Sequence, residues 1–87
     1  MNKHFEDTRY YLTRAMETAA RGVREELAPI EARFRELSGR EEAPEPSRLA
    51  AIREELGVLE QRAEGEAKAA IAEARERLEA YRAELAQ

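Results

Sequence analysis

Ser38-Gly39-Arg40-Glu41-Glu42-Ala43-Pro44-Glu45-Pro46-Ser47 separates two long segments whose apolar residues recur at helical spacing. Gly39 suits the position just after a helix C-terminus, and Pro46 or Ser47 suits the first turn or the N-cap of the next helix. A short break between two helical segments makes the chain fold back on itself. The sequence therefore predicts an all-α fold, an antiparallel two-helix hairpin whose interhelical loop covers residues 38–46.

The first helix is expected over about residues 3–37, with Asn2 as its N-cap. Beyond Leu12 its apolar positions are spaced by three or four residues and form one stripe: Phe5, Leu12, Met16, Ala19, Val23, Leu27, Ile30, Phe34 and Leu37. Pro29 interrupts this stripe, because proline has no N–H to donate and its ring crowds the preceding turn. The helix either breaks at Ala28 or kinks and continues. The stripe keeps its phase across Pro29, which favours a kink.

The second helix is expected over about residues 47–86. Its stripe consists of Leu49, Ile52, Leu56, Leu59, Ala63, Ala67, Ala70, Ala74, Leu78, Tyr81 and Leu85. Folding at the loop pairs positions whose numbers add to roughly 84. Phe5 then meets Leu78 and Tyr81 at one end of the seam, and alanines from both helices meet in the middle, where the backbones can approach closely.

The predicted core is thin. Leu, Ile, Val and Phe together number 15 of the 87 residues, although the 17 alanines favour helix. A two-helix hairpin has a single seam, and small scaffolds of this kind often gain stability by association. We therefore expect one domain, residues 1–87, that forms a homo-oligomer, most simply a dimer in which two hairpins make a four-helix bundle.

Composition excludes several classes of protein. The chain has no cysteine, so disulfides and thiolate metal sites are impossible. It has no apolar run near the roughly 20 residues of a membrane span and no apolar core of a signal peptide. The expectation is a cytoplasmic protein without a membrane role.

The single histidine, His4, lies near the N-terminus, and phosphate-loop and paired metal-ligand motifs are absent. We therefore predict no catalytic residue, no metal and no cofactor, and hence no enzyme.

A second stripe of mostly small residues runs along the second helix, on the side away from the seam. It consists of Val58, Gly65, Ala69, Ala72, Glu76, Ala80 and Ala83. Small side chains let another helix pack closely, so one interpretation is a self-association interface. The alternative is that surface alanine is simply a good helix former.

A basic and aromatic face is predicted on the first helix. Its residues are Lys3, Arg9, Tyr10, Arg14 and Arg21. Four of them are spaced by 7, 4 and 7, which places them opposite the seam. Such a face is suited to phosphate or to an acidic protein surface, with Tyr10 stacking on a base or filling a pocket. The alternative is an ordinary solvated surface, and the net charge of −4 weighs against a nucleic-acid partner.

Three strings carry a family resemblance: residues 1–7 followed by Arg9-Tyr10-Tyr11-Leu12, then Glu45-Pro46-Ser47-Arg48-Leu49, and Arg62-Ala63-Glu64-Gly65-Glu66-Ala67. They resemble a family of short, uncharacterised α-helical proteins of halophilic archaea, a domain of unknown function. The resemblance spans nearly the whole chain and implies no particular activity. The net charge of −4 is smaller in magnitude than is usual for proteins of a high-salt cytoplasm.

The resulting hypothesis is a non-catalytic helical-hairpin protein that acts as a self-associating structural or protein-interaction module. The alternative is a nucleic-acid-associated or ribosome-associated protein that uses the basic face of the first helix. A binding partner of either kind is left open by the sequence.

Overall fold

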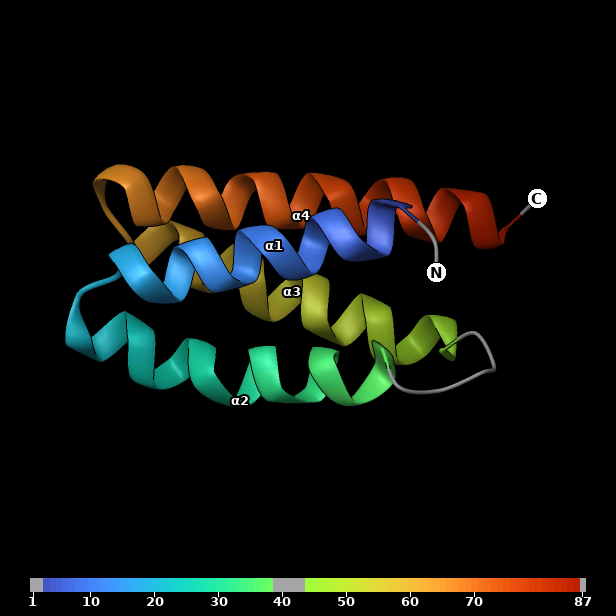
Figure 1. Ribbon diagram of the computed structural model, residues 1–87, viewed down its shortest axis with the longest axis horizontal. Coiled ribbons are helices and arrows are strands. Elements are labelled where there is room, and N and C mark those ends of the chain that lie inside the picture. The colour runs from blue at the N-terminus through green and yellow to red at the C-terminus, as the bar shows by residue number, and fades with distance from the viewer. Residues whose placement is uncertain (1–2, 39–43, 87) are drawn as a thin grey trace.

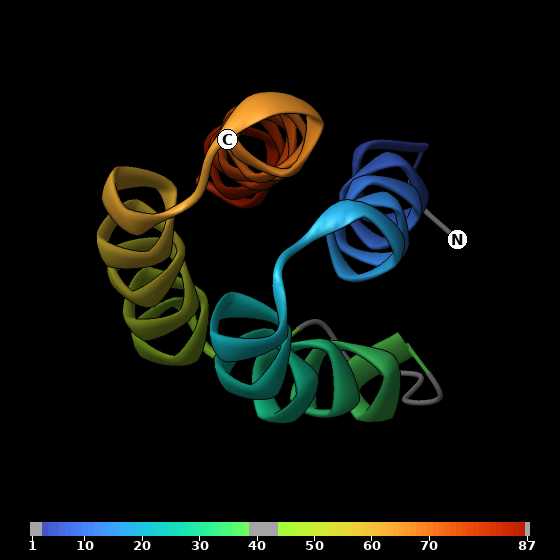
Figure 2. The ribbon, with the colours of Figure 1, turned by 90° about the vertical axis from the view of Figure 1, so that its left-hand side faces the viewer.

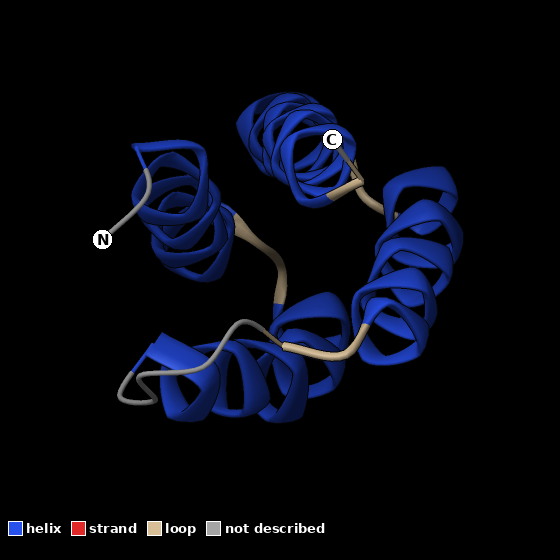
Figure 3. Ribbon diagram, turned by 90° about the vertical axis from the view of Figure 1, so that its right-hand side faces the viewer, coloured by secondary structure: helices blue, strands red, loops and turns tan. Residues whose placement is uncertain are grey.

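Four helices make up the computed structural model, which describes residues 3–38 and 44–86. They are α1 (Lys3–Thr18), α2 (Arg21–Ser38), α3 (Pro46–Arg62) and α4 (Gly65–Leu85) (Figure 1). Figure 3 shows helices and connecting loops, and no strand, in these two ranges. The predicted all-α class is confirmed.

The helices follow one another around a common core in the order α1, α4, α3, α2 (Figure 2). The bundle measures 35 × 20 × 20 Å along its principal axes. A four-helix bundle was expected from two associated hairpins, whereas here one chain supplies all four helices.

The predicted division into two long helices is wrong at two places. The first helix ends at Thr18 and the chain resumes as α2 at Arg21, and the second ends at Arg62 and resumes as α4 at Gly65. The physical reason is burial of the apolar stripes. In an extended hairpin each stripe has one partner, whereas folding the hairpin double lets α1 cover α2 and α3 cover α4 as well.

The helix through Pro29 does not break. Residues Arg21–Ser38 form the single helix α2 with Pro29 inside it, as the continuous stripe predicted. Pro29 is exposed, and its carbonyl accepts a hydrogen bond from Nε of Arg33 at 3.4 Å. Asn2 and Gly39, the predicted flanking residues of the first helix, lie outside the described residues, as does the central part of the predicted loop.

An aromatic cluster closes one end of the core and joins three helices. The ring of Phe5 in α1 stacks on Phe34 in α2, with centroids 4.2 Å apart. The same ring meets Tyr81 of α4 edge-to-face at 5.2 Å. The contact with Tyr81 was predicted from the hairpin register, and the contact with Phe34 exists only because the hairpin folds double. Burial, followed by the nearby Glu84 carboxylate, raises the pKa of the Tyr81 phenol.

Alanines fill the interface between α1 and α4. Ala15 of α1 and Ala67, Ala70 and Ala74 of α4 are all buried. Their small side chains allow the two helices to pack closely, and this is the most extensive helix–helix interface of the bundle. The buried hydroxyl of Thr8 donates a hydrogen bond to the carbonyl of His4 at 2.8 Å, so it adds no unsatisfied polar group.

Candidate functional site

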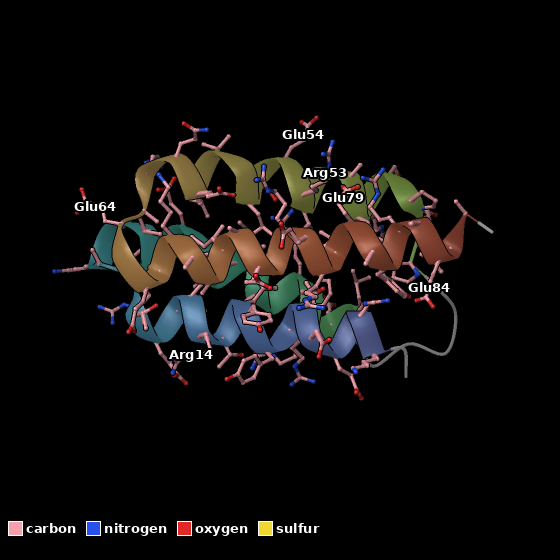
Figure 4. The ribbon with its side chains drawn as sticks, turned by 90° about the horizontal axis from the view of Figure 1, so that it is seen from above. Arg14, Arg53, Glu54, Glu64, Glu79 and Glu84 are labelled. Atoms are coloured by element: carbon pink, nitrogen blue, oxygen red, sulfur yellow. The ribbon has the colours of Figure 1, made fainter. Side chains whose placement is uncertain are left out.

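The outward face of α1 carries the predicted basic and aromatic residues. Lys3, Tyr10 and Arg14 lie along one line of the helix and are exposed, and Figure 4 shows Arg14 pointing away from the bundle. The Tyr10 side chain is 59% exposed, although its ring meets that of Tyr11 edge-to-face at 5.1 Å. Tyr11 packs against the core and so supports Tyr10 from beneath.

The outward face of α1 carries cations that have no ion-pair partner in the described part of the chain. Within the described ranges, no carboxylate lies at ion-pair distance from Lys3, Arg9 or Arg14. Asp7 and Glu17 share the same side of α1, so the face has mixed charge. It is suited to a ligand that meets separate positive charges and an aromatic ring.

Arg21, the fifth predicted member, does not continue this line. The periodicity that placed it there required an unbroken helix, and Arg21 is instead the first residue of α2. Its Nε pairs with Oε1 of Glu25 at 3.1 Å on the exposed surface. The structure therefore brings together the four predicted residues of α1 and leaves Arg21 beyond the break.

The outward face of α4 is the second predicted surface. Gly65, Ala69, Glu76 and Ala83 are exposed, and Ala72 and Ala80 are half-buried. They follow one line along α4, opposite the side that contains the buried Ala74. We call these six residues the α4 stripe. It is a narrow, smooth surface with one charged side chain.

Val58 does not belong to that surface. It lies in α3 and is 60% exposed, in a shallow groove between α2 and α3. One hollow of this groove has a volume of about 380 Å³ and includes Pro29 and Ile30 from α2. A second hollow of about 330 Å³ continues past Leu37.

This groove was missed by sequence reasoning. It arises because α2 and α3 form the least extensive interface of the ring, bridged at the surface by ion pairs of Arg33 with Glu55 and of Arg62 with Glu26. Val58 itself could have indicated the groove, because it is an apolar residue outside the main stripe. The sequence pattern instead placed it in the small-residue stripe of the second helix.

Ion pairs hold α3 against α4. Arg53 and Glu79 lie side by side between the two helices in Figure 4, with Nε and Oε1 2.7 Å apart. Glu79 also pairs with Arg82 at 2.7 Å, and Arg75 reaches Glu60 at 3.0 Å. Two of these pairs, Arg53–Glu79 and Arg75–Glu60, join α3 to α4, and each charge in the cluster has an opposite partner.

Among residues 3–38 and 44–86, no three His, Cys, Asp or Glu side chains are grouped so as to hold a metal ion. His4 Nε2 lies 3.9 Å from Oε2 of Glu84. Within the same ranges, none of the helices has the length and apolar character needed to cross a bilayer.

A family of unknown function, DUF7553, matches residues 1–84. No curated protein and no solved structure matches this chain.

Proposed function

We propose that this chain, which belongs to the DUF7553 family, is a non-catalytic module that associates with a second copy of itself through the α4 stripe. The observation that supports this role is the outward-facing line of mostly small, exposed or half-buried residues along α4. From Gly65 to Ala83 the line extends about 27 Å at 1.5 Å per residue. The lack of cysteine fits a reducing compartment, so we place this role in the cytoplasm.

The contact that fits this surface is a symmetric, antiparallel pairing of two α4 helices. Because an isologous interface uses the same patch on both copies, the two stripes meet at their centres. Glu76 of one copy then lies opposite the small Ala72 of the other, and the ends of the stripe meet small residues. This arrangement keeps the two Glu76 carboxylates from facing each other.

We expect the bundle to fold without this contact. Twenty apolar side chains are buried within the described part of one chain. Association therefore adds a surface to an already complete core. This separates the proposed function from stability, so a variant of the α4 stripe should lose association and keep its fold.

We expect Ala72→Glu to raise the dissociation constant of the dimer by on the order of 100-fold. The new carboxylate would face Glu76 across the contact and would also prevent close approach. Light scattering on a sizing column measures the mass, and the urea midpoint measures stability. Ala32→Glu, at an exposed alanine of α2, is the matched control and should leave the dimer intact. A dimer that survives Ala72→Glu would rule out the α4 stripe as its interface.

A second candidate function is supported by the outward face of α1. Tyr10 exposes its ring between Arg9 and Arg14, neither of which has a carboxylate partner among the described residues. A base stacks on an exposed aromatic ring while arginines neutralise its phosphates. This combination favours a single-stranded nucleic acid, or RNA within a ribosome, as the alternative partner.

For this alternative, we expect Arg14→Glu to weaken RNA binding and to reduce the slope of log affinity against log salt by about one unit. The slope falls because one phosphate contact is lost. A mobility-shift titration of a single-stranded RNA at two salt concentrations measures both quantities. Arg48→Glu, which changes an exposed arginine of α3, is the control for net charge. Equal losses for both variants would show that only net charge matters, and no binding at low salt would exclude this function.

A further inference from the structure

The two short connections of the bundle lie at the same level. Ala19–Ala20 join α1 to α2, and Ala63–Glu64 join α3 to α4. Both lie at the same end of the molecule (Figure 1). The bundle is thus a two-helix hairpin folded double at one transverse line, with α1 and α4 in one half and α2 and α3 in the other. We call this line the hinge.

The buried stripe runs through the hinge without losing its helical phase. Ala19 lies four residues after the buried Ala15 and four before the buried Val23. In the α3–α4 part of the hairpin, Ala63 lies midway between Leu59 and Ala67 at the same spacing, and all three are buried. A straight helix through either connection would therefore present the same residues on the same face.

Little in the local sequence enforces the bend. Each connection has only two residues, and neither contains proline. Glu64, the N-cap of α4, makes no side-chain capping hydrogen bond. Gly65 is the exception. Its φ of +60° lies in the left-handed region of backbone conformation, which residues other than glycine rarely adopt.

We propose that the chain exchanges halves with a second copy by opening at this hinge. In the exchanged dimer α1 and α2 form one continuous helix, α3 and α4 form another, and two open hairpins pack together into two bundles. This inference goes beyond the proposed function: the partner is again a second copy, but this route of association runs through the hinge and is independent of the α4 stripe. Short connections are a common route to exchange of this kind.

A second copy is the partner that fits the opened hairpin. Opening separates α1 from α2 and α3 from α4, and keeps α1 with α4 and α2 with α3. The Phe5–Phe34 stack and the Arg53–Glu79 pair are then lost within the chain and reform between copies. A second open copy presents the same surfaces in the same order, so all the contacts of the monomer are recovered.

The first test uses Gly65→Ala. In the folded monomer alanine at this position is strained by the positive φ, while in a continuous helix alanine is preferred to glycine. Apart from the adjacent residues and the backbone of its own helix, no heavy atom lies within 4 Å of the added Cβ, so the effect is conformational. We expect the dissociation constant of the dimer to fall by about 10³- to 10⁴-fold, because both copies carry the change. Gly22→Ala is the matched control, since Gly22 lies in α2 without a positive φ or a neighbour within 4 Å, and should leave the constant unchanged.

Arg21→Pro should act in the opposite direction. Arg21 is the first residue of α2, a position that suits proline, and the carbonyl of Ala20 already accepts the N–H of Arg24 at 2.9 Å. In a continuous helix the same proline would clash with the preceding turn. We expect the exchanged dimer to be lost and the monomer to stay folded. Arg21→Gln controls for loss of the exposed ion pair with Glu25.

The opened state is measured directly by a distance within one chain. Spin labels are attached through Glu6→Cys and Ala32→Cys, two exposed positions near the Phe5–Phe34 stack in a chain that has no other cysteine. The labelled protein is diluted into excess unlabelled protein, unfolded in urea and refolded at high concentration. The monomer holds the two helix axes about 10 Å apart at this level, whereas a continuous helix separates the positions by about 40 Å.

A population near 40 Å that grows with Gly65→Ala and disappears with Arg21→Pro supports the exchange. If the labelled protein at high concentration shows only short distances, both with and without Gly65→Ala, the exchange is overturned. If Gly65→Ala fails to fold, the labelled protein without it decides. A dimer with short distances that dissociates with Ala72→Glu would retain the proposed function and overturn the exchange. A dimer that shows the long distance and does not dissociate with Ala72→Glu would support the exchange and overturn the α4 stripe as the interface.

Discussion

Replacing Phe34 with alanine is expected to lower the free energy of unfolding by about 4 kcal/mol. Phe34 is fully buried, and its ring stacks on Phe5 at 4.2 Å. Phe5 in turn contacts Tyr81, so the cavity would open where α1, α2 and α4 meet. Total stability for a domain of this size is about 4–13 kcal/mol, so the loss is a large fraction of it. Urea denaturation followed by circular dichroism measures the change.

The matched control for this substitution is Phe34→Leu, which keeps most of the buried volume and removes the ring. A double-mutant cycle with Phe5→Leu should give a coupling of about 1 kcal/mol between the two rings. A cost below about 1 kcal/mol for Phe34→Ala would contradict the stacked geometry, because such a small loss is typical of exposed positions.

Ala74→Glu should unfold the protein at neutral pH. Ala74 is fully buried in α4, the helix that packs most extensively on α1. A carboxylate at this position would be desolvated with no cation beside it, which costs about 5 kcal/mol in addition to steric strain. Circular dichroism and thermal melting measure the loss of helix.

The pH dependence of Ala74→Glu has a definite sign. Burial would raise the pKa of the new carboxyl above its unfolded value of about 4.3. The charge penalty is absent below that pH, where both states are protonated, grows as the pH rises above it, and is complete once the pH exceeds the raised pKa of the folded state. Ala32→Glu introduces the same side chain at an exposed position and should change stability by less than about 0.5 kcal/mol. A stable Ala74→Glu protein at pH 7 would show that α1 and α4 are not packed at this point.

The faces of the helices could be predicted from the sequence because burial follows the period of 3.6 residues. Phe5 faces Tyr81, as the hairpin register required, and α2 is uninterrupted at Pro29 because the stripe keeps its phase. The antiparallel direction of the two halves of the chain could be predicted because a short loop before Pro46 reverses the chain. These features depend on local spacing and on one reversal of the chain, both of which are visible in a single sequence.

The breaks at Ala19–Ala20 and Ala63–Glu64 could not be predicted in the same way. Alanine is a strong helix former, so the first break has no local signal, and the phase of the stripe is unchanged across both. The choice between a straight and a folded hairpin depends on contacts between distant residues, such as Phe5 with Phe34. Gly65 carried a signal, since a glycine just after a break can adopt positive φ, but a glycine inside a helical pattern equally suits a close approach of two backbones.

The sequence predicted correctly which residues share a surface only when those residues lie in the same helix of the structure. Lys3, Tyr10 and Arg14 share a face because all three lie in α1, and Arg21 leaves it because a break intervenes. Val58 likewise lies apart from the α4 stripe, in the groove beside α2. Errors in the surfaces therefore have the same cause as errors in the fold.

The extensive packing of α1 on α4 has a consequence for synthesis of the protein in the cell. Ribosomes release α1 first and α4 last among the four helices, so the largest partner of α1 is the final one to appear. Contacts that join distant parts of a chain form slowly, because a long loop must close first. The nascent chain consequently holds the apolar side of α1 without its main cover until translation has passed Leu85, and this interval is when chaperones have most access to it.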